Sequence, residues 1–201
     1  MHGHPSVAAC VIAPDGRWLI IGAADGGATV WDLDAGQART DLAGHDSRIT
    51  GAAITPDGAK IVTVSRDGTA RVWDTATGTH TATFGGHAGE VTSCAIAPDG
   101  SWVVTTGDDG TARIWDPCTG LEHRTLRGHT GPVAGCAVAP NGSWLVTAGT
   151  DGLLCTWTPA DGVAVAAIRV DEALSDFCCL PDGSGVCAVS DRGIYLISYD
   201  P

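Results

Sequence analysis

Short runs rich in Val, Ile, Thr and Trp alternate with turn residues along most of the chain. Between positions 44 and 85, such runs at 49–55, 59–65 and 69–74 are separated by Pro-Asp-Gly and Arg-Asp-Gly. A fourth run at 79–84 follows a Thr-Gly pair. Runs of this length and composition between Gly and Pro turns are typical of strands in antiparallel hairpins. The pattern therefore predicts a four-stranded antiparallel meander in this segment.

The same pattern recurs with a fixed period. Trp31, Trp73, Trp115 and Trp157 are spaced 42 residues apart. Pro-Asp-Gly or Pro-Asn-Gly triplets begin at 14, 56, 98, 140 and 181, Asp-Gly pairs begin at 25, 67, 109 and 151, and Gly-His pairs begin at 3, 44, 86 and 128. One four-stranded sheet cannot bury both of its faces, so repeated sheets are expected to stack around an axis as a β-propeller.

The order Gly-His, Pro-Asp-Gly, Asp-Gly and Trp-Asp resembles the WD40 repeat, and the resemblance covers essentially the whole chain. It implies an all-β fold, a β-propeller of about five four-stranded antiparallel blades. The copies predict blades at about 3–43, 44–85, 86–127 and 128–169, and a degenerate, incomplete blade at about 170–201. The second and third copies match best, because each ends in Trp-Asp, whereas the fifth lacks both the Gly-His pair and the tryptophan.

The family resemblance also implies a hydrogen-bonded tetrad of His, Thr, Asp and Trp in each well-formed blade. An indole N–H can donate to the hydroxyl, the hydroxyl can meet the imidazole, and the carboxylate can fix the imidazole tautomer. The first copy has Ile21 at the threonine position, so we expect a poorer network there. The implied tetrads are His45, Thr63, Asp67 and Trp73; His87, Thr105, Asp109 and Trp115; and His129, Thr147, Asp151 and Trp157.

The tetrads contain the groups of a nucleophile and its base, but their repetition favours a structural role. We therefore predict no catalytic residues and no enzyme. His-x-x-x-His and Cys-x-x-Cys pairs with ligand spacing are lacking, as is a Gly-rich phosphate motif, so we expect no metal and no cofactor. Cys10, Cys94 and Cys136 share one position on the expected inner strands, where we expect them to pack as small apolar side chains.

Charge and composition narrow the choice of partner. The 201 residues carry 23 acidic and 11 basic side chains, a net charge of -12. Nucleic acid and anionic membranes are bound through clustered Lys and Arg, so we expect neither as a partner. The chain has no apolar stretch long enough for a membrane helix and no secretory signal, and its eight cysteines do not suit a small disulfide scaffold. These features favour a cytoplasmic protein, and the excess of Gly, Ala and Arg favours a bacterial source.

Variable positions on the repeated frame predict a binding surface. In the family, partners often contact the top face, at positions flanking the first strand of each blade and just before the tetrad Asp. These positions differ from copy to copy while the frame residues are constant, as in a non-catalytic interaction scaffold or sensor that binds a protein or peptide. The candidate contact residues are Arg48, Thr50, Arg66, Glu90, Thr92, Asp108 and Thr150.

Several alternatives stay open. A ligand-binding or hydrolytic propeller would use the axial channel, and its candidates are the irregular carboxylates Asp171, Glu172 and Asp176. Bacterial WD40 arrays also form the sensor ends of signalling ATPases and kinases, so the chain could be a fragment of such a protein. The fifth copy lacks an outer strand, so the sequence does not say how the ring closes. The chain could be part of a larger propeller, its five blades could close imperfectly, or copies could associate through the open sheet edge or missing blades.

Overall fold

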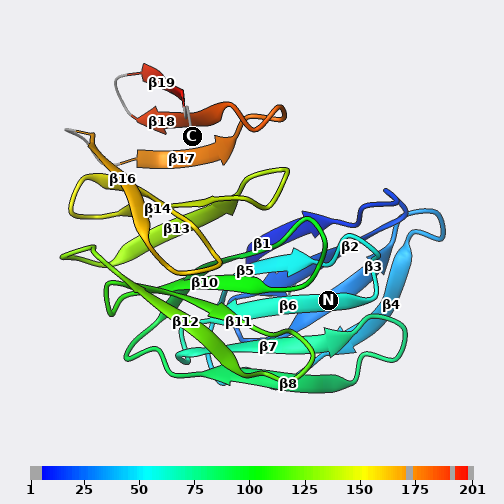
Figure 1. The fold of residues 1–201 in the computed structure, drawn as a ribbon. Coiled ribbons are helices and arrows are strands. Elements are labelled where there is room, and N and C mark those ends of the chain that lie inside the picture. The colour runs from blue at the N-terminus through cyan, green and yellow to red at the C-terminus, as the bar shows by residue number, and fades with distance from the viewer. Residues whose placement is uncertain (1–5, 171–173, 191–192, 199–201) are drawn as a thin grey trace.

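The computed structural model describes residues 6–170, 174–190 and 193–198, which form nineteen strands in five antiparallel sheets (Figure 1). None of these residues forms a helix, so nothing in the described ranges is a helix that could cross a membrane. The first sheet contains β1 (Val7–Ile12), β2 (Trp18–Ala23), β3 (Ala28–Asp32) and β4 (Gln37–Leu42). The second contains β5 (Ile49–Ile54), β6 (Lys60–Ser65), β7 (Thr69–Asp74) and β8 (His80–Gly85), and the third contains β9 (Val91–Ile96), β10 (Val103–Gly107), β11 (Thr111–Trp115) and β12 (Glu122–Arg127). The fourth contains β13 (Val133–Val138), β14 (Leu145–Gly149), β15 (Leu153–Trp157) and β16 (Ala164–Arg169), and the fifth contains β17 (Leu174–Cys179), β18 (Gly185–Ser190) and β19 (Gly193–Ser198).

Each sheet is a meander in which neighbouring strands follow one another in the chain. The predicted strands of the second copy agree with the structure to within one residue at each end; the run at 69–74, for example, is β7. The all-β prediction and the four-stranded antiparallel sheets are therefore confirmed for the first four copies. Three strands of the fifth sheet are described.

The Pro-Asp-Gly turns set where each hairpin reverses. In the turn between β5 and β6, the N–H of Gly58 donates to the carbonyl of Thr55 at 2.8 Å, and the carboxylate of Asp57 accepts from the N–H of Ala59 at 3.0 Å. Gly58 has a φ of +70°, a left-handed conformation that costs other residues energy. The local sequence thus specifies both the turn and the register of the two strands.

Neighbouring sheets pack face to face, with the inner strands β1, β5, β9, β13 and β17 side by side in chain order (Figure 1). Between the second and third sheets, Val62 and Phe84 share one buried cluster with Val103 and Trp115. The rings of Phe84 and Trp115 are stacked, with centroids 5.2 Å apart and planes 4° apart. The side of each sheet that carries the tetrad tryptophan is therefore covered by the preceding sheet.

The two end faces of the described array lack such a cover. Val7 at the start of β1 is 60% exposed, whereas Ile49 and Val91, at the same position of β5 and β9, are 1% and 0% exposed. At the other end, Ile194 and Leu196 on β19 are each 71% exposed. Both ends thus present apolar sheet surface to solvent within the described part of the chain.

Candidate functional site

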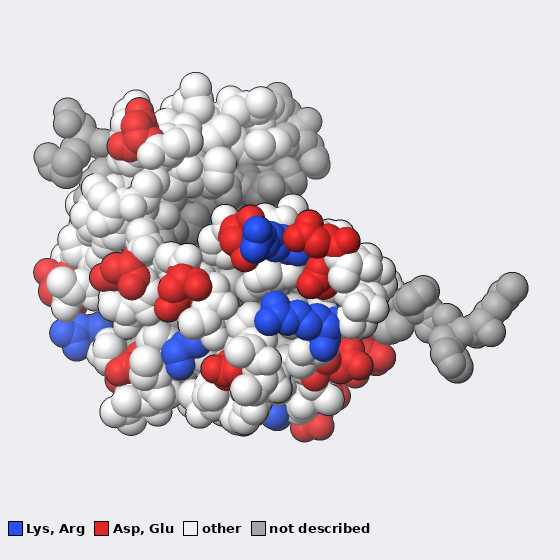
Figure 2. Space-filling model, turned by 90° about the vertical axis from the view of Figure 1, so that its right-hand side faces the viewer, with Lys and Arg blue, Asp and Glu red and all other residues white. Residues whose placement is uncertain are grey.

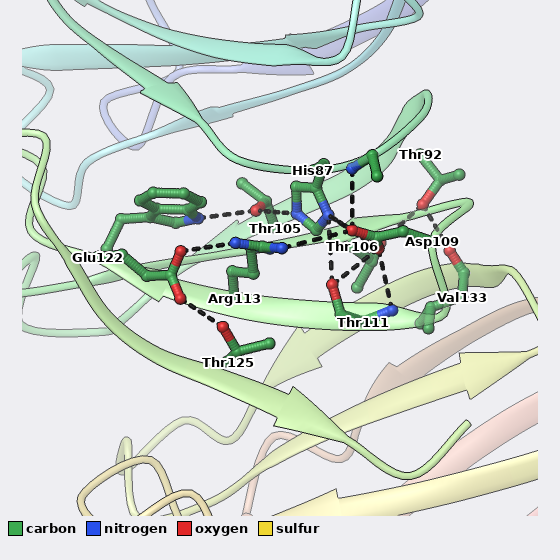
Figure 3. A network of polar contacts seen from close by, with 12 residues as sticks. His87, Thr92, Thr105, Thr106, Asp109, Thr111, Arg113, Glu122, Thr125 and Val133 are labelled. Atoms are coloured by element: carbon green, nitrogen blue, oxygen red, sulfur yellow. Dashed lines mark hydrogen bonds and ion pairs between the residues drawn. The ribbon is translucent and has the colours of Figure 1, made fainter. Parts of the chain in front are cut away.

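The third sheet holds a chain of hydrogen bonds that joins four side chains from different elements (Figure 3). The indole N–H of Trp115, on β11, donates to Thr105 Oγ1, on β10, at 2.8 Å. His87 Nε2, from the loop before β9, lies 2.8 Å from the same hydroxyl, and His87 Nδ1 lies 3.1 Å from Asp109, in the turn after β10. The network ties the loop that enters the sheet to two of its strands.

The same arrangement occurs in the second and fourth sheets. The Trp-to-Thr distances are 2.8 and 2.9 Å, the His-to-Thr distances are both 2.8 Å, and the His-to-Asp distances are 2.8 and 3.1 Å. The structure thus brings together the residues of each implied tetrad: His45, Thr63, Asp67 and Trp73 in the second sheet, and His129, Thr147, Asp151 and Trp157 in the fourth.

Burial sets the protonation of these networks. Burial lowers the pKa of His45 and His87, and the neighbouring carboxylates offset this effect only in part. Burial alone would raise the pKa of Asp109, but hydrogen bonds from Thr111, the Ala88 N–H and His87 hold it well below its usual range. A neutral imidazole that donates from Nδ1 to an ionised carboxylate can accept the threonine proton at Nε2. Every donor of this hydrogen-bonded network then has an acceptor.

The first sheet lacks this network at its centre. Ile21 stands where the second, third and fourth sheets have threonine, so this position offers no hydroxyl to the Trp31 indole. A cavity of about 300 Å³ lies against the first sheet, lined by residues that include Val7, Ile21 and Trp31. The expected poorer network in the first copy follows from the missing hydroxyl.

The candidate contact residues meet in pairs at the top face, the end of each sheet where β5, β9 and β13 begin. The Arg66 N–H donates to the Arg48 carbonyl at 3.0 Å, and the Asp108 N–H donates to the Glu90 carbonyl at 3.0 Å. In the fourth sheet, the N–H of Thr150 makes the equivalent bond to the residue before β13, at 2.8 Å. The side chains of Arg48, Arg66, Asp108 and Thr150 are exposed.

Two of the candidates have their hydroxyl groups engaged inside the molecule. Thr50 Oγ1 donates to the carbonyl of Val91 in the next sheet at 2.5 Å, and Thr92 Oγ1 donates to the carbonyl of Val133 at 2.5 Å. Both hydroxyls are partly buried. These bonds join the second sheet to the third and the third to the fourth.

A shallow groove of about 490 Å³ crosses the top face between the second and third sheets. Arg66 of the second sheet and Glu90 of the third both line it, and Arg66 Nε lies 3.3 Å from Glu90 Oε2. Both side chains stay accessible, 50% and 39% exposed respectively. The rest of the lining includes four glycines, Gly68, Gly85, Gly86 and Gly89.

The family model for the WD domain, G-beta repeat, matches residues 1–32, 36–74, 78–116 and 120–158. The chain belongs to the WD40 family. The matched segments cover four repeats and most of the sequence.

One curated relative matches a short segment of this WD40 chain. The chain is 46% identical over 35 residues to "Nuclear distribution protein PAC1-1" of Uncinocarpus reesii. That match covers 17% of this chain and 8% of the relative, so the chain spans a small part of that protein's length.

Sequence reasoning missed the glycine lining of the groove on this WD40 array. A Cβ added at Gly68, which has a φ of +83°, would lie 3.0 Å from the carbonyl oxygen of Gly89 in the next sheet. The signal in the sequence was the Gly85-Gly86 doublet. At the position of Gly85, before the glycine of the Gly-His pair, the neighbouring copies have Ala43 and Arg127. Gly85, Gly86 and Gly89 are exposed at this groove, whereas Gly68 allows the close approach of the two sheets.

The tetrads are poorly placed for chemistry on a substrate. Thr63, Thr105 and Thr147 are each 0% exposed, so their hydroxyls cannot reach a reacting group in solvent. Within the described ranges, His, Cys, Asp and Glu side chains form no group of three or more that could hold a metal ion. WD40 propellers are typically non-catalytic scaffolds.

The structure describes the thiols of the inner strands more fully than the carboxylates considered for the axial channel. All eight cysteines are free, and burial raises the pKa of Cys94 and raises that of Cys136 to about 12, so both stay protonated. The prediction that Cys10 packs like these two is wrong, because Cys10 is exposed on the uncovered side of the first sheet. Asp171 and Glu172 lie outside the described residues, and Asp176 is described only as a backbone position of β17.

Proposed function

We propose that this WD40 array is a non-catalytic interaction module, a scaffold or sensor, that binds a protein or peptide over its top face. WD40 domains generally bind protein partners. The observation that carries the proposal is the groove between the second and third sheets, where variable charged residues flank exposed backbone. Arg48 and Asp108 of the same two sheets, and Thr150 of the fourth sheet, are exposed on the same surface.

The groove suits an extended segment that carries a charged side chain. Arg66 and Glu90 are held in place by their mutual ion pair, but each is exposed enough to exchange that partner for a group on a ligand. An exposed ion pair contributes little to folding stability, about 0–1 kcal/mol, so its exchange costs little. Exposed backbone at the glycines can add main-chain hydrogen bonds, as in other modes of peptide recognition.

Surface charge supports a protein partner over nucleic acid. Figure 2 shows one side of the molecule, on which acidic and basic side chains are interspersed. The drawn residues of this side form no continuous basic surface of the kind that follows a phosphate backbone. With the net charge of -12, this distribution favours local charge pairing with a protein segment.

Charge reversal at the groove tests the proposal. Proteins captured by the wild-type chain from its source cells are identified by mass spectrometry and compared with those captured by R66E and E90R. The matched control is R39E, which changes net charge as R66E does but lies exposed on the outer strand β4. We expect the groove variants to lose the captured partners and R39E to keep them. Unchanged capture by both groove variants would show that the partner binds elsewhere.

A further inference from the structure

The outer strand of the fourth sheet differs in chemistry from the charged outer strands of the first and third sheets, and it also lacks the polar His80, Thr81 and Thr83 of β8. β4 carries Arg39 and Asp41, and β12 begins with Glu122, His123 and Arg124. At the positions of β12 residues 122–125, β16 has Ala, Val, Ala and Ala. Charged side chains on an outer strand discourage pairing with a strand of another molecule, and β16 has lost them along most of its length.

The apolar residues of β16 are also open to solvent. Val163, just before the strand, is 55% exposed, and Val165 and Ile168 are 47% and 39% exposed. Ile168 occupies the position of Phe84 and Leu126, which are each 1% exposed. β16 and the residue before it therefore present exposed apolar side chains to solvent.

The outward edge of β16 belongs to a complete sheet. β16 is the last of four strands, and the chain leaves it at the buried Val170, so the described residues add no strand to this edge (Figure 1). β19 is also an apolar edge strand, but its sheet has three described strands and residues 199–201 lie outside the description. β16 is thus the apolar outer edge of a complete four-stranded sheet in the described part of the chain, where β4, β8 and β12 are the more polar ones.

We propose that β16 pairs antiparallel with β16 of a second copy of this chain, which joins two four-stranded sheets across a two-fold axis. Placing Val163 opposite Ile168 of the second copy pairs these two exposed apolar residues at both ends of the contact, with Val165 opposite Ala166. The same register sets Arg169 opposite Gly162, diagonal to the exposed Asp161, so opposite charges meet at both ends of the pair. The contact is isologous and closes at two copies.

The alternative edges are less suited to a second copy. Pairing through β12 would crowd the Arg113–Glu122 ion pair, whose atoms lie 2.7 Å apart, and pairing through β4 would bury Arg39 or Asp41. A pair of six-residue strands buries less than the roughly 1,200 Å² of a stable interface. We therefore expect a weak dimer that forms as concentration rises.

Sedimentation equilibrium of the full chain, from micromolar to millimolar concentration, tests the proposal. We expect a monomer–dimer equilibrium for the wild type, and V165R, which puts a charge on the edge, to remain a monomer with an unchanged circular dichroism spectrum. The control H123R introduces arginine at the equivalent exposed position of β12 and should dimerise as the wild type does.

A third variant distinguishes the two apolar edges. L196R charges β19 and should leave the dimer intact. The proposal is overturned if the wild type is monomeric over the whole range, or if L196R abolishes association while V165R does not. Because none of these positions lies in the top-face groove, failure here leaves the binding proposal for that groove unaffected, and the reverse also holds.

Discussion

Replacement of Thr105 by valine isolates the hydroxyl at the centre of the third tetrad. Thr105 is 0% exposed, and its Oγ1 is the partner of both Trp115 Nε1 and His87 Nε2 at 2.8 Å. Valine has nearly the same shape, so T105V creates no large cavity but leaves two buried polar groups without a partner. Each such group costs about 1–3 kcal/mol, and the added methyl recovers part of the loss. We expect the free energy of unfolding to fall by about 2–4 kcal/mol.

Urea unfolding followed by tryptophan fluorescence, together with hydrogen exchange of the β10 and β11 amides, measures this loss. T105S keeps the hydroxyl and removes a methyl group, so it should cost about 1 kcal/mol. I21V changes the equivalent position of the first sheet, where no hydroxyl is present, and should cost no more than about 1 kcal/mol. If T105V is no more destabilised than T105S and I21V, the hydrogen bonds of the tetrad do not stabilise the sheet as reasoned.

Three further outcomes are expected. Because burial lowers the pKa of His45 and His87 in the folded state, the unfolded chain takes up protons first; stability should be fully present above about pH 6.5 and fall as pH drops below that value. The depressed pKa of Asp109 should add a further loss below about pH 4, and a flat free energy of unfolding from pH 7.5 to 3.5 would contradict both statements. T92V removes the bond from Thr92 to the fourth sheet and should lower the free energy of unfolding by about 1–2 kcal/mol; an unchanged urea midpoint would show that this bond contributes nothing. G58A should cost about 1–2 kcal/mol from its left-handed φ alone, since a Cβ there would lie 3.9 Å from Trp18, and wild-type stability of this variant would argue against strain at the turn.

The sequence by itself determined the strands, the turns and the composition of the tetrads. These depend on local chemistry: β-branched residues favour extended backbone, and the Pro-Asp-Gly triplets specify where it reverses. Because the period repeats, the four members of each tetrad were also identifiable, through the family resemblance, before their contacts were known. The 2.8 Å contact of His87 with Thr105, for instance, joins residues that the repeat marks in every well-formed copy.

Tertiary structure alone decided which of these surfaces are free. Thr50 and Arg66 look equally accessible as variable residues of one copy, yet the hydroxyl of Thr50 is bonded to the next sheet and Arg66 stands beside an open groove. Val7 and Val91 occupy the same strand position, but one is exposed and the other buried. The physical reason is that the accessibility of a side chain depends on the neighbouring sheet, which lies some forty residues away in the chain. Local sequence does not determine how closely two sheets approach, or whether a second sheet is present.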